Sequence, residues 1–156
     1  MITFKIGSAR EMTALGKALG KNLKGGEIIE LIGPLGAGKT TLAKGILAGA
    51  GAASGFSPTF VLDAVHKTAK RKIREIHHLD LYRLKSPDEL ITLGLEDLTN
   101  QKNTVLVIEW AERFKLLPKN DKLKARILVK KDCREVKITA DDKYKKLVQN
   151  IRSGFA

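Results

Sequence analysis

The feature that most constrains this chain is a glycine-rich stretch between a short apolar segment and an amphipathic one. Residues 33–40 read Gly-Pro-Leu-Gly-Ala-Gly-Lys-Thr and match the pattern G-x-x-x-x-G-K-[ST] at every fixed position. The preceding segment, Ile28–Ile32, is rich in β-branched residues and bounded by glycines, which predicts a buried strand. Helical spacing follows from Lys39 to Ala50. A strand, a glycine-rich turn and a helix in this order predict a phosphate-binding loop.

Each position of this loop has a chemical reason. Glycines let backbone N–H groups point inward, so that the loop and the helix N-terminus can bind phosphate oxygens. We predict that Lys39 reaches the β- and γ-phosphates of ATP, that Thr40 binds Mg²⁺ and that Thr41 donates to the α-phosphate. The alternative is a glycine-rich turn followed by a chance Lys-Thr. The predicted nucleotide-binding residues are Gly33, Gly36, Ala37, Gly38, Lys39, Thr40 and Thr41.

Acidic residues end two other predicted strands. Glu109 closes the apolar strand Thr104–Glu109, and Asp80 follows the strand Ile73–Leu79. Ligands of α/β proteins bind at the carboxyl ends of strands, so we expect Glu109 to hold Mg²⁺ or its water. Asp80 would orient the attacking water or complete the metal shell. The alternatives are a solvated strand-end acid and an ion pair between Asp80 and Arg83. The predicted catalytic residues are Lys39, Asp80 and Glu109.

Three further features bear on the site. The loop Ser57-Pro58-Thr59-Phe60 could bring the Thr59 hydroxyl to Mg²⁺ as switch loops do, although alone it indicates only a turn. His77 and His78 point to opposite faces of a strand, which excludes a two-histidine metal clamp and favours packing roles. Trp110 is either a core residue or a contact for a partner. The predicted metal ligands are Thr40, Glu109, Thr59 and Asp80.

The remaining segments alternate between strand and helix patterns. Ile2–Ile6 is extended, and the capping boxes Ser8–Glu11 and Ser86–Glu89 each predict a helix start, the second helix stopping near Gly94. The helix after Ser8 is expected to end at Gly25-Gly26. Strands are predicted over Phe60–Val65, Ala125–Val129 and Glu135–Thr139. The basic stretch Lys67–Lys72, between Phe60–Val65 and the strand Ile73–Leu79, is expected to form an exposed hairpin tip. A terminal helix is predicted over Asp141–Arg152.

This order predicts one α/β domain over residues 1–156. We expect a P-loop NTPase-like three-layer sandwich, with a mixed, mostly parallel sheet and a C-terminal hairpin plus helix. No apolar run approaches the roughly 20 residues that span a bilayer, and no signal peptide is evident, so we expect a cytoplasmic protein without membrane contact.

The net charge of +12 points to an anionic partner. Between Lys115 and Arg152 there are 13 Lys and Arg residues against 5 Asp and Glu residues, so +8 of this charge lies in the last quarter of the chain. If these side chains share a face with Lys67, Lys70, Arg71 and Lys72, they would follow a tRNA backbone or an acidic partner. A solvated basic surface is the alternative.

Six motifs follow one another along the chain: Thr13–Gly16, Gly33–Thr41, Ser57–Phe60, His78–Leu84, Ser86–Leu90 with Gly94, and Ile108–Trp110. In this order they resemble the bacterial ATPase family of tRNA threonylcarbamoyladenosine biosynthesis, TsaE. The resemblance covers roughly residues 8–116 of the sequence. The family usually has Asp at the position of Pro34 and an apolar or small residue at that of Asp63.

The resemblance implies a small P-loop ATPase that supports, without performing, threonylcarbamoyl transfer to the adenosine next to the tRNA anticodon. It also implies partners: the transferase subunit and its inactive paralogue. Residues 36–41 match the family's nucleotide site, with Thr40 and Glu109 at Mg²⁺, Asp80 and Thr59 nearby, and Trp110 an aromatic beside the site.

Two other functions compete with this interpretation. A small-molecule or nucleoside P-loop kinase shares the loop, but it needs an acceptor pocket and an arginine-bearing lid that no segment clearly provides. A non-enzymatic, nucleotide-dependent tRNA-binding module would account for the basic charge. A GTPase is less well supported, because the sequence has no Asn-Lys-x-Asp base-reading motif.

Overall fold

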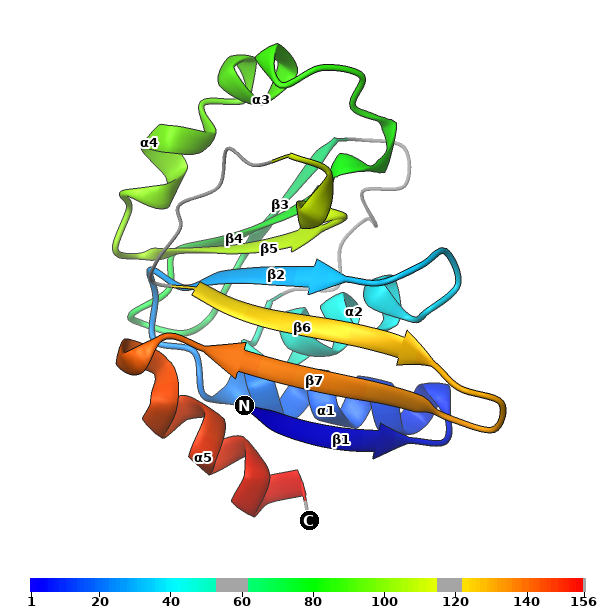
Figure 1. Ribbon diagram of the computed structural model, residues 1–156. Helices are drawn as coiled ribbons and strands as arrows, with labels where there is room; N and C mark the ends of the chain where they lie inside the picture. Colours follow the sequence, from blue (N-terminus) through cyan, green and yellow to red (C-terminus); the bar gives the residue numbers. More distant parts are fainter. Residues whose placement is uncertain (53–61, 115–121, 156) are drawn as a thin grey trace.

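A seven-stranded sheet forms the centre of the molecule, with the strand order β1-β7-β6-β2-β5-β4-β3 (Figure 1). The computed structural model describes residues 1–52, 62–114 and 122–155. Strands β1, β6, β2, β5 and β4 run in one direction, and β7 and β3 run against them. This confirms the predicted mixed, mostly parallel sheet. The strands are β1 (Ile2–Ile6), β2 (Ile28–Ile32), β3 (Asp63–Lys67), β4 (Glu75–Asp80), β5 (Thr104–Glu109), β6 (Lys122–Val129) and β7 (Arg134–Ala140).

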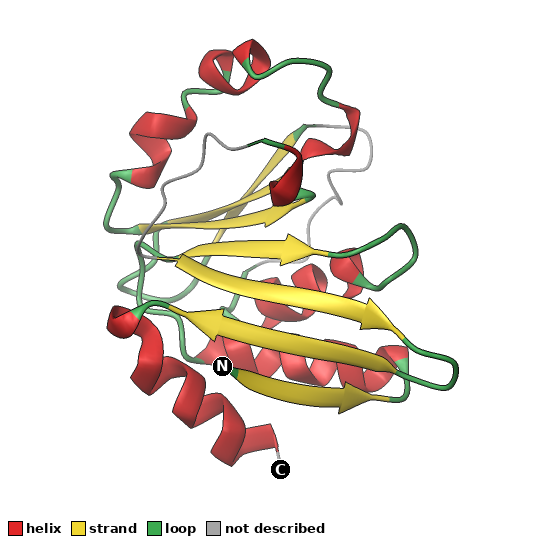
Figure 2. Ribbon diagram, viewed as in Figure 1, coloured by secondary structure: helices red, strands yellow, loops and turns green. Residues whose placement is uncertain are grey.

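Helices lie on both faces of the sheet (Figure 2). Helices α1 (Ala9–Lys21), α2 (Lys39–Gly49) and α5 (Lys145–Phe155) share one apolar cluster with strand residues such as Leu31 and Val107. Helices α3 (Asp88–Thr92) and α4 (Leu95–Thr99) share a second cluster with Leu106 and Ile108. Successive residues of a strand point to opposite faces, so β5 contributes to both clusters. The three-layer α/β fold is confirmed. None of the helices in the described part of the chain has the length and apolar character that a membrane span requires.

Helix α1 begins at the predicted capping box. The Ser8 side chain accepts a hydrogen bond from the backbone N–H of Glu11, and the Glu11 carboxylate accepts one from Gly7 N–H. The helix ends at Lys21, earlier than the glycine pair predicted. There Lys70 donates from Nζ to the carbonyl oxygens of Gly20 and Lys21, at 2.9 Å each. This residue of the basic hairpin therefore caps a helix and does not reach into solvent.

Glycines let α1 and α2 pack at very short range. A Cβ built on any of the four would lie within 3.0 Å of backbone atoms of the facing helix. Larger side chains cannot fit into such a contact without moving a helix, because protein interiors are close-packed. The contact therefore fixes the position of α2, whose first turn belongs to the phosphate-binding loop. The glycines are Gly16 and Gly20 on α1 and Gly45 and Gly49 on α2.

We expect Gly16→Ala to destabilise the protein. Helix propensity alone would favour alanine by about 1 kcal/mol. The added Cβ meets Leu42 O and the backbone of Gly45, so overpacking costs roughly 1–3 kcal/mol and reverses the sign. Urea titration of both proteins measures the difference in the free energy of unfolding. A variant more stable than the parent would contradict the close contact.

The segment between β4 and β5 differs from its prediction. The Ser86–Glu89 box forms only in part: the Glu89 carboxylate accepts from the backbone N–H of Ser86 at 3.0 Å, but Pro87 occupies the N-cap position and no side chain caps the helix. Helix α3 ends before Gly94, as predicted. Gly94, at φ 62°, is the N-cap of α4, a second short helix that the sequence did not indicate. Of the predicted strand Phe60–Val65, residues 60 and 61 lie outside the described residues.

Asp63, the unusual residue of β3, pairs with a histidine of β4. Its carboxylate lies 2.6 Å from His77 Nδ1, and the Glu75 carboxylate lies 3.7 Å from His77 Nε2. The His77 side chain is 9% exposed. The hydrogen bond to Asp63 raises the pKa of His77 above its ordinary value, against the opposing effect of burial. The native fold therefore favours a protonated His77.

This pair predicts a pH-dependent contribution to stability. Because the folded-state pKa of His77 is raised, the contribution is complete below the ordinary value of 6.5 and is lost as pH rises through the folded-state pKa. Asp63→Asn should therefore lower the melting temperature more at about pH 6 than at about pH 9. Asp132→Asn, at an exposed turn position, is the control and should show no such difference. An equal loss at both pH values would exclude the charged pair.

Candidate functional site

The phosphate-binding loop connects β2 to α2. Strand β2 ends at Ile32, and Gly33, Gly36 and Gly38 have φ values of 154°, 73° and 107°. These conformations favour glycine, and they turn the chain so that α2 begins at Lys39. Ala37 is buried beneath the loop, and Thr41 stands in the first turn of α2. The predicted strand–loop–helix unit is thus present with its backbone curled as a phosphate cradle requires.

The side chain of Lys39 folds back onto this loop. Its Nζ donates to Gly33 O at 2.7 Å and to Pro34 O at 2.9 Å, and it lies 3.6 Å from the centre of the Trp110 ring. Burial lowers the pKa of Lys39, while the nearby charges of Glu109, Glu112 and Asp80 act to raise it. Pro34 lacks an N–H but supplies a carbonyl to this arrangement. The ammonium group is therefore held against its own loop.

The two predicted carboxylates lie side by side. Asp80 ends β4 and Glu109 ends β5, and they are paired in register across the parallel strands. Thr40 Oγ1 donates to Glu109 Oε2 at 2.8 Å, which joins the loop to the end of β5. The Asp80 carboxylate accepts from the backbone N–H of Tyr82 at 3.0 Å, and the described residues show no Asp80–Arg83 ion pair. The structure brings together Lys39, Thr40, Asp80 and Glu109, as the sequence indicated.

His78 is a site residue that sequence reasoning missed. It is fully buried, and its Nε2 lies 2.8 Å from Glu109 Oε1. The two oxygens of Glu109 are thus bound by Thr40 and His78, which fixes the orientation of a carboxylate that is itself buried. His78 is thus packed in the core, as the sequence indicated, and it has in addition a contact with Glu109 that the sequence analysis did not foresee. The sequence did contain a signal for this contact. Side chains alternate between the two faces of a strand, so His78 lies on the same face of β4 as the predicted site residue Asp80.

Trp110 covers the site from the side of β5. It is the one residue other than glycine with positive φ among those described, at 61°. This sparsely populated conformation turns the chain after Glu109 and places the indole over Lys39. Tyr82 packs against the indole with ring centres 4.9 Å apart. Trp110 is partly buried: it packs against the apolar cluster of α3 and α4 and forms one wall of the site. A contact of Trp110 with a partner stays a prediction.

Two cavities flank the loop. One, of about 450 Å³, is lined by Lys39, Thr40, Asp80, Glu109 and Trp110 among others. The second, of about 330 Å³, lies on the far side of Gly36 and Gly38 and is bounded by the N-terminus of α1 and by Arg134. Thr41 contributes to both cavities. The predicted ligand Thr59, with Ser57–Phe60, lies outside the described residues.

Comparison with known proteins identifies the family. The family model described as "Threonylcarbamoyl adenosine biosynthesis protein TsaE" matches residues 6–138. The chain belongs to the TsaE family. A TsaE protein of Haemophilus influenzae is 37% identical over 131 residues, which cover 83% of this chain and 78% of that protein. One of Rickettsia prowazekii is 39% identical over 114 residues, covering 72% and 76%.

Other relatives extend the comparison of this TsaE chain. A Mycobacterium tuberculosis protein, named for tRNA threonylcarbamoyladenosine biosynthesis, is 43% identical over 103 residues. The match covers 63% of this chain and only 61% of that relative. The crystal structure of Bacillus subtilis YdiB superposes with a TM-score of 0.73 at 26% identity, covering 97% of this chain and 94% of that one. The α/β architecture is therefore shared over nearly the whole chain.

The contact of Lys39 with Trp110 provides a test for nucleotide binding. Trp110 is the only tryptophan of this TsaE chain, and its indole touches the ammonium group that a phosphate would attract. We expect a change in tryptophan emission on addition of ATP with Mg²⁺, and a much smaller change in Lys39→Met. Calorimetry on the same samples reports binding independently. Emission that stays constant while calorimetry registers binding would show that Lys39 does not move.

Proposed function

We propose that this protein is a Mg²⁺-dependent ATPase. The observation that carries the proposal is the convergence of Lys39, Thr40, Asp80 and Glu109 from three separate elements on one cavity of about 450 Å³. A glycine-rich turn with a chance Lys-Thr would not require two strand-end carboxylates beside it. Hydroxyl, ammonium and carboxylate groups in this arrangement serve phosphoryl transfer to water.

The residues present fit a magnesium ion. Mg²⁺ is bound in proteins by one or two oxygen ligands together with phosphate oxygens and water. Thr40 Oγ1 and Glu109 Oε2 lie 2.8 Å apart at the mouth of the loop and supply an oxygen pair of this kind. When bound, the ion would neutralise negative charge on the β- and γ-phosphate oxygens. Asp80 is a further proposed contact, directly or through water, and Thr59 remains a proposal from the sequence.

The chain's own groups then have defined roles. Loop N–H groups and the N-terminus of α2 bind the phosphates, and Lys39 exchanges its two carbonyl partners for phosphate oxygens. Asp80 or Glu109 orients the water that attacks the γ-phosphorus in line, with ADP as the leaving group. His78 holds Glu109 in place through the oxygen that Thr40 leaves available. All of these groups bind or position; none forms a covalent bond with the phosphate.

We also propose where the nucleoside lies. The cavity of about 330 Å³ begins at Thr41, the residue expected at the α-phosphate, and extends to the start of α1. A triphosphate in the first cavity would direct its nucleoside into this one. Ser8, Met12 and Arg134 line it and would contact the base and ribose. These residues come from the first and last quarters of the chain, which the loop motif alone does not indicate.

Family membership supports a proposal for the biological role. Relatives of this chain are named tRNA threonylcarbamoyladenosine biosynthesis proteins. We propose that ATP hydrolysis here supports threonylcarbamoyl transfer to the adenosine next to the anticodon, in the cytoplasm. The proposed partners are the transferase subunit, its inactive paralogue and tRNA. Hydrolysis by the isolated chain would then be slow and would rise when the two subunits are present.

Hydrolysis assays test this function. We expect Lys39→Ala and Glu109→Gln each to lower the rate of phosphate release by about 100-fold or more, the size typical of a lost electrostatic contact at the transition state. Glu109→Gln should also raise the Mg²⁺ concentration needed for half-maximal activity, because the amide lacks the carboxylate's charge. Each assay is run with labelled ATP, with and without the two partner subunits.

The control is Lys44→Ala, an exposed position on the same helix as Lys39, which should leave the rate unchanged. Melting curves show whether each variant is folded. Phosphate release by Lys39→Ala at the parental rate would contradict the proposed site. Transfer of label to an added small molecule or nucleoside, in place of free phosphate, would favour a kinase.

A further inference from the structure

One half of the sheet has a face without a covering helix among the described residues. Along β1, β7 and β6, the apolar residues point toward α1, α2 and α5, and the alternate residues point away. Helices α3 and α4 lie over β2, β5 and β4 instead, so Figure 1 looks onto this open face. We call it the outer face. Its residues are Thr3 and Lys5 of β1, Glu135, Lys137 and Thr139 of β7, and Lys124, Arg126 and Leu128 of β6.

The outer face is strongly basic. Its carboxylate, Glu135, lies 3.9 Å from Lys130 of the adjoining turn. At its border with β2, buried Glu30 is already paired with Lys122 at 2.7 Å and approached by Lys124 at 3.7 Å. Within the described part of the chain, Lys5, Arg126 and Lys137 form no ion pair. Glu30 and Glu135 thus have lysine partners, while these three positive charges have no carboxylate partner.

Two of the unneutralised charges stand directly opposite each other. Arg126 of β6 and Lys137 of β7 are register partners on the same face of an antiparallel pair. Such partners have Cβ atoms about 5 Å apart, and like charges there destabilise a sheet. Thr3 of β1 is the next residue in the row, so no carboxylate separates or bridges the two. An anion bound between them would remove the repulsion.

The shape and chemistry of the outer face favour a polyanion. Strand β6 has eight residues and is about 26 Å long, which is long enough to contact several phosphates of a helix. The face carries no aromatic side chain on which bases could stack and one aliphatic residue, Leu128. The short helices α3 and α4 instead expose Asp88, Glu89, Glu96 and Asp97. An anion is therefore attracted to the sheet and repelled from the α3–α4 side.

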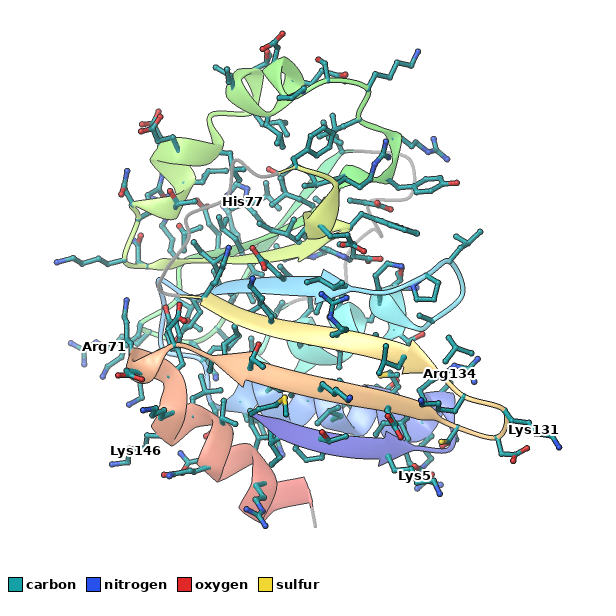
Figure 3. The ribbon with its side chains drawn as sticks, viewed as in Figure 1. Lys5, Arg71, His77, Lys131, Arg134 and Lys146 are labelled. Carbon is teal, nitrogen blue, oxygen red and sulfur yellow. The ribbon has the colours of Figure 1, made fainter. Side chains whose placement is uncertain are left out.

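We propose that the outer face binds the phosphate backbone of RNA, without reading its sequence. The choice of RNA among polyanions rests on the proposed role in tRNA modification. Lys5, Lys131 and Arg134 gather at one end of the face, whereas Arg71 and Lys146 lie at the other side of the molecule (Figure 3). Arg134 also lines the proposed nucleoside cavity. RNA bound to the outer face would thus extend toward the proposed nucleotide. Arg71 and Lys146 lie too far from this face to form one continuous basic patch with it.

The test compares two triple variants with the same change in net charge. The first, Lys124→Gln/Arg126→Gln/Lys137→Gln, neutralises the outer face. The second, Lys17→Gln/Lys44→Gln/Lys146→Gln, neutralises exposed positions on α1, α2 and α5. Binding of an unmodified tRNA transcript is measured by fluorescence anisotropy over a series of salt concentrations. Each lost phosphate contact lowers the salt slope by about 0.9 for a duplex, so we expect a decrease of roughly 2–3 for the first variant.

The first variant should bind tRNA at least tenfold more weakly than the parent, and the second within about twofold. Equal losses in both variants, or no tRNA binding by the parent, would overturn the proposal. Preference for polyglutamate over tRNA would assign the face to an acidic protein instead. ATP hydrolysis should be unchanged in the first variant, and its melting temperature should not fall, because the variant removes the repulsion between Arg126 and Lys137. Measuring Lys39→Ala as well separates the two proposals, because it should lose hydrolysis and retain tRNA binding.

Discussion

The close packing of α1 on α2 is the constraint on which the site depends. Four glycines bring the two helices so near that a single methyl group at any of them would displace backbone. Helix α2 carries the end of the phosphate-binding loop, and α1 forms the border of the second cavity. A contact made only of small residues cannot adjust by rotating a side chain. The geometry of the proposed nucleotide site thus depends on α1, a helix that contributes few of the site's functional groups.

Glu109 shows how the remaining elements are joined. It is a buried carboxylate at the end of an apolar strand, where an unpaired charge would be costly. Thr40 from the loop and His78 from the neighbouring strand both reach it, and Asp80 stands beside it in register. Three pieces of the chain are therefore oriented by one side chain. The same contacts that stabilise the buried acid hold it where the proposed chemistry needs an oxygen ligand.

The sequence predicted what depends on local pattern and missed what depends on register. The loop, β5 and the cap of α1 follow from spacing within a few residues, and strand ends predicted that Asp80 and Glu109 would meet. Finding the contact of His78 required knowing which strand lies beside β4. The pairing of Asp63 with His77, the capping of α1 by Lys70 and the row formed by Arg126 and Lys137 likewise join distant segments. No periodicity within one segment encodes such partners.

The position of Lys39 has a consequence for selectivity. Its ammonium group is already satisfied by two carbonyl oxygens and an aromatic ring, so any anion that enters must compete with them. A small ion such as inorganic phosphate offers little beyond that exchange. A ligand with a long phosphate chain and a nucleoside gains additional contacts in the neighbouring cavity. For the proposed nucleotide, selectivity over small anions would then come from the partners that Lys39 already has, because only a larger ligand gains contacts that offset their loss.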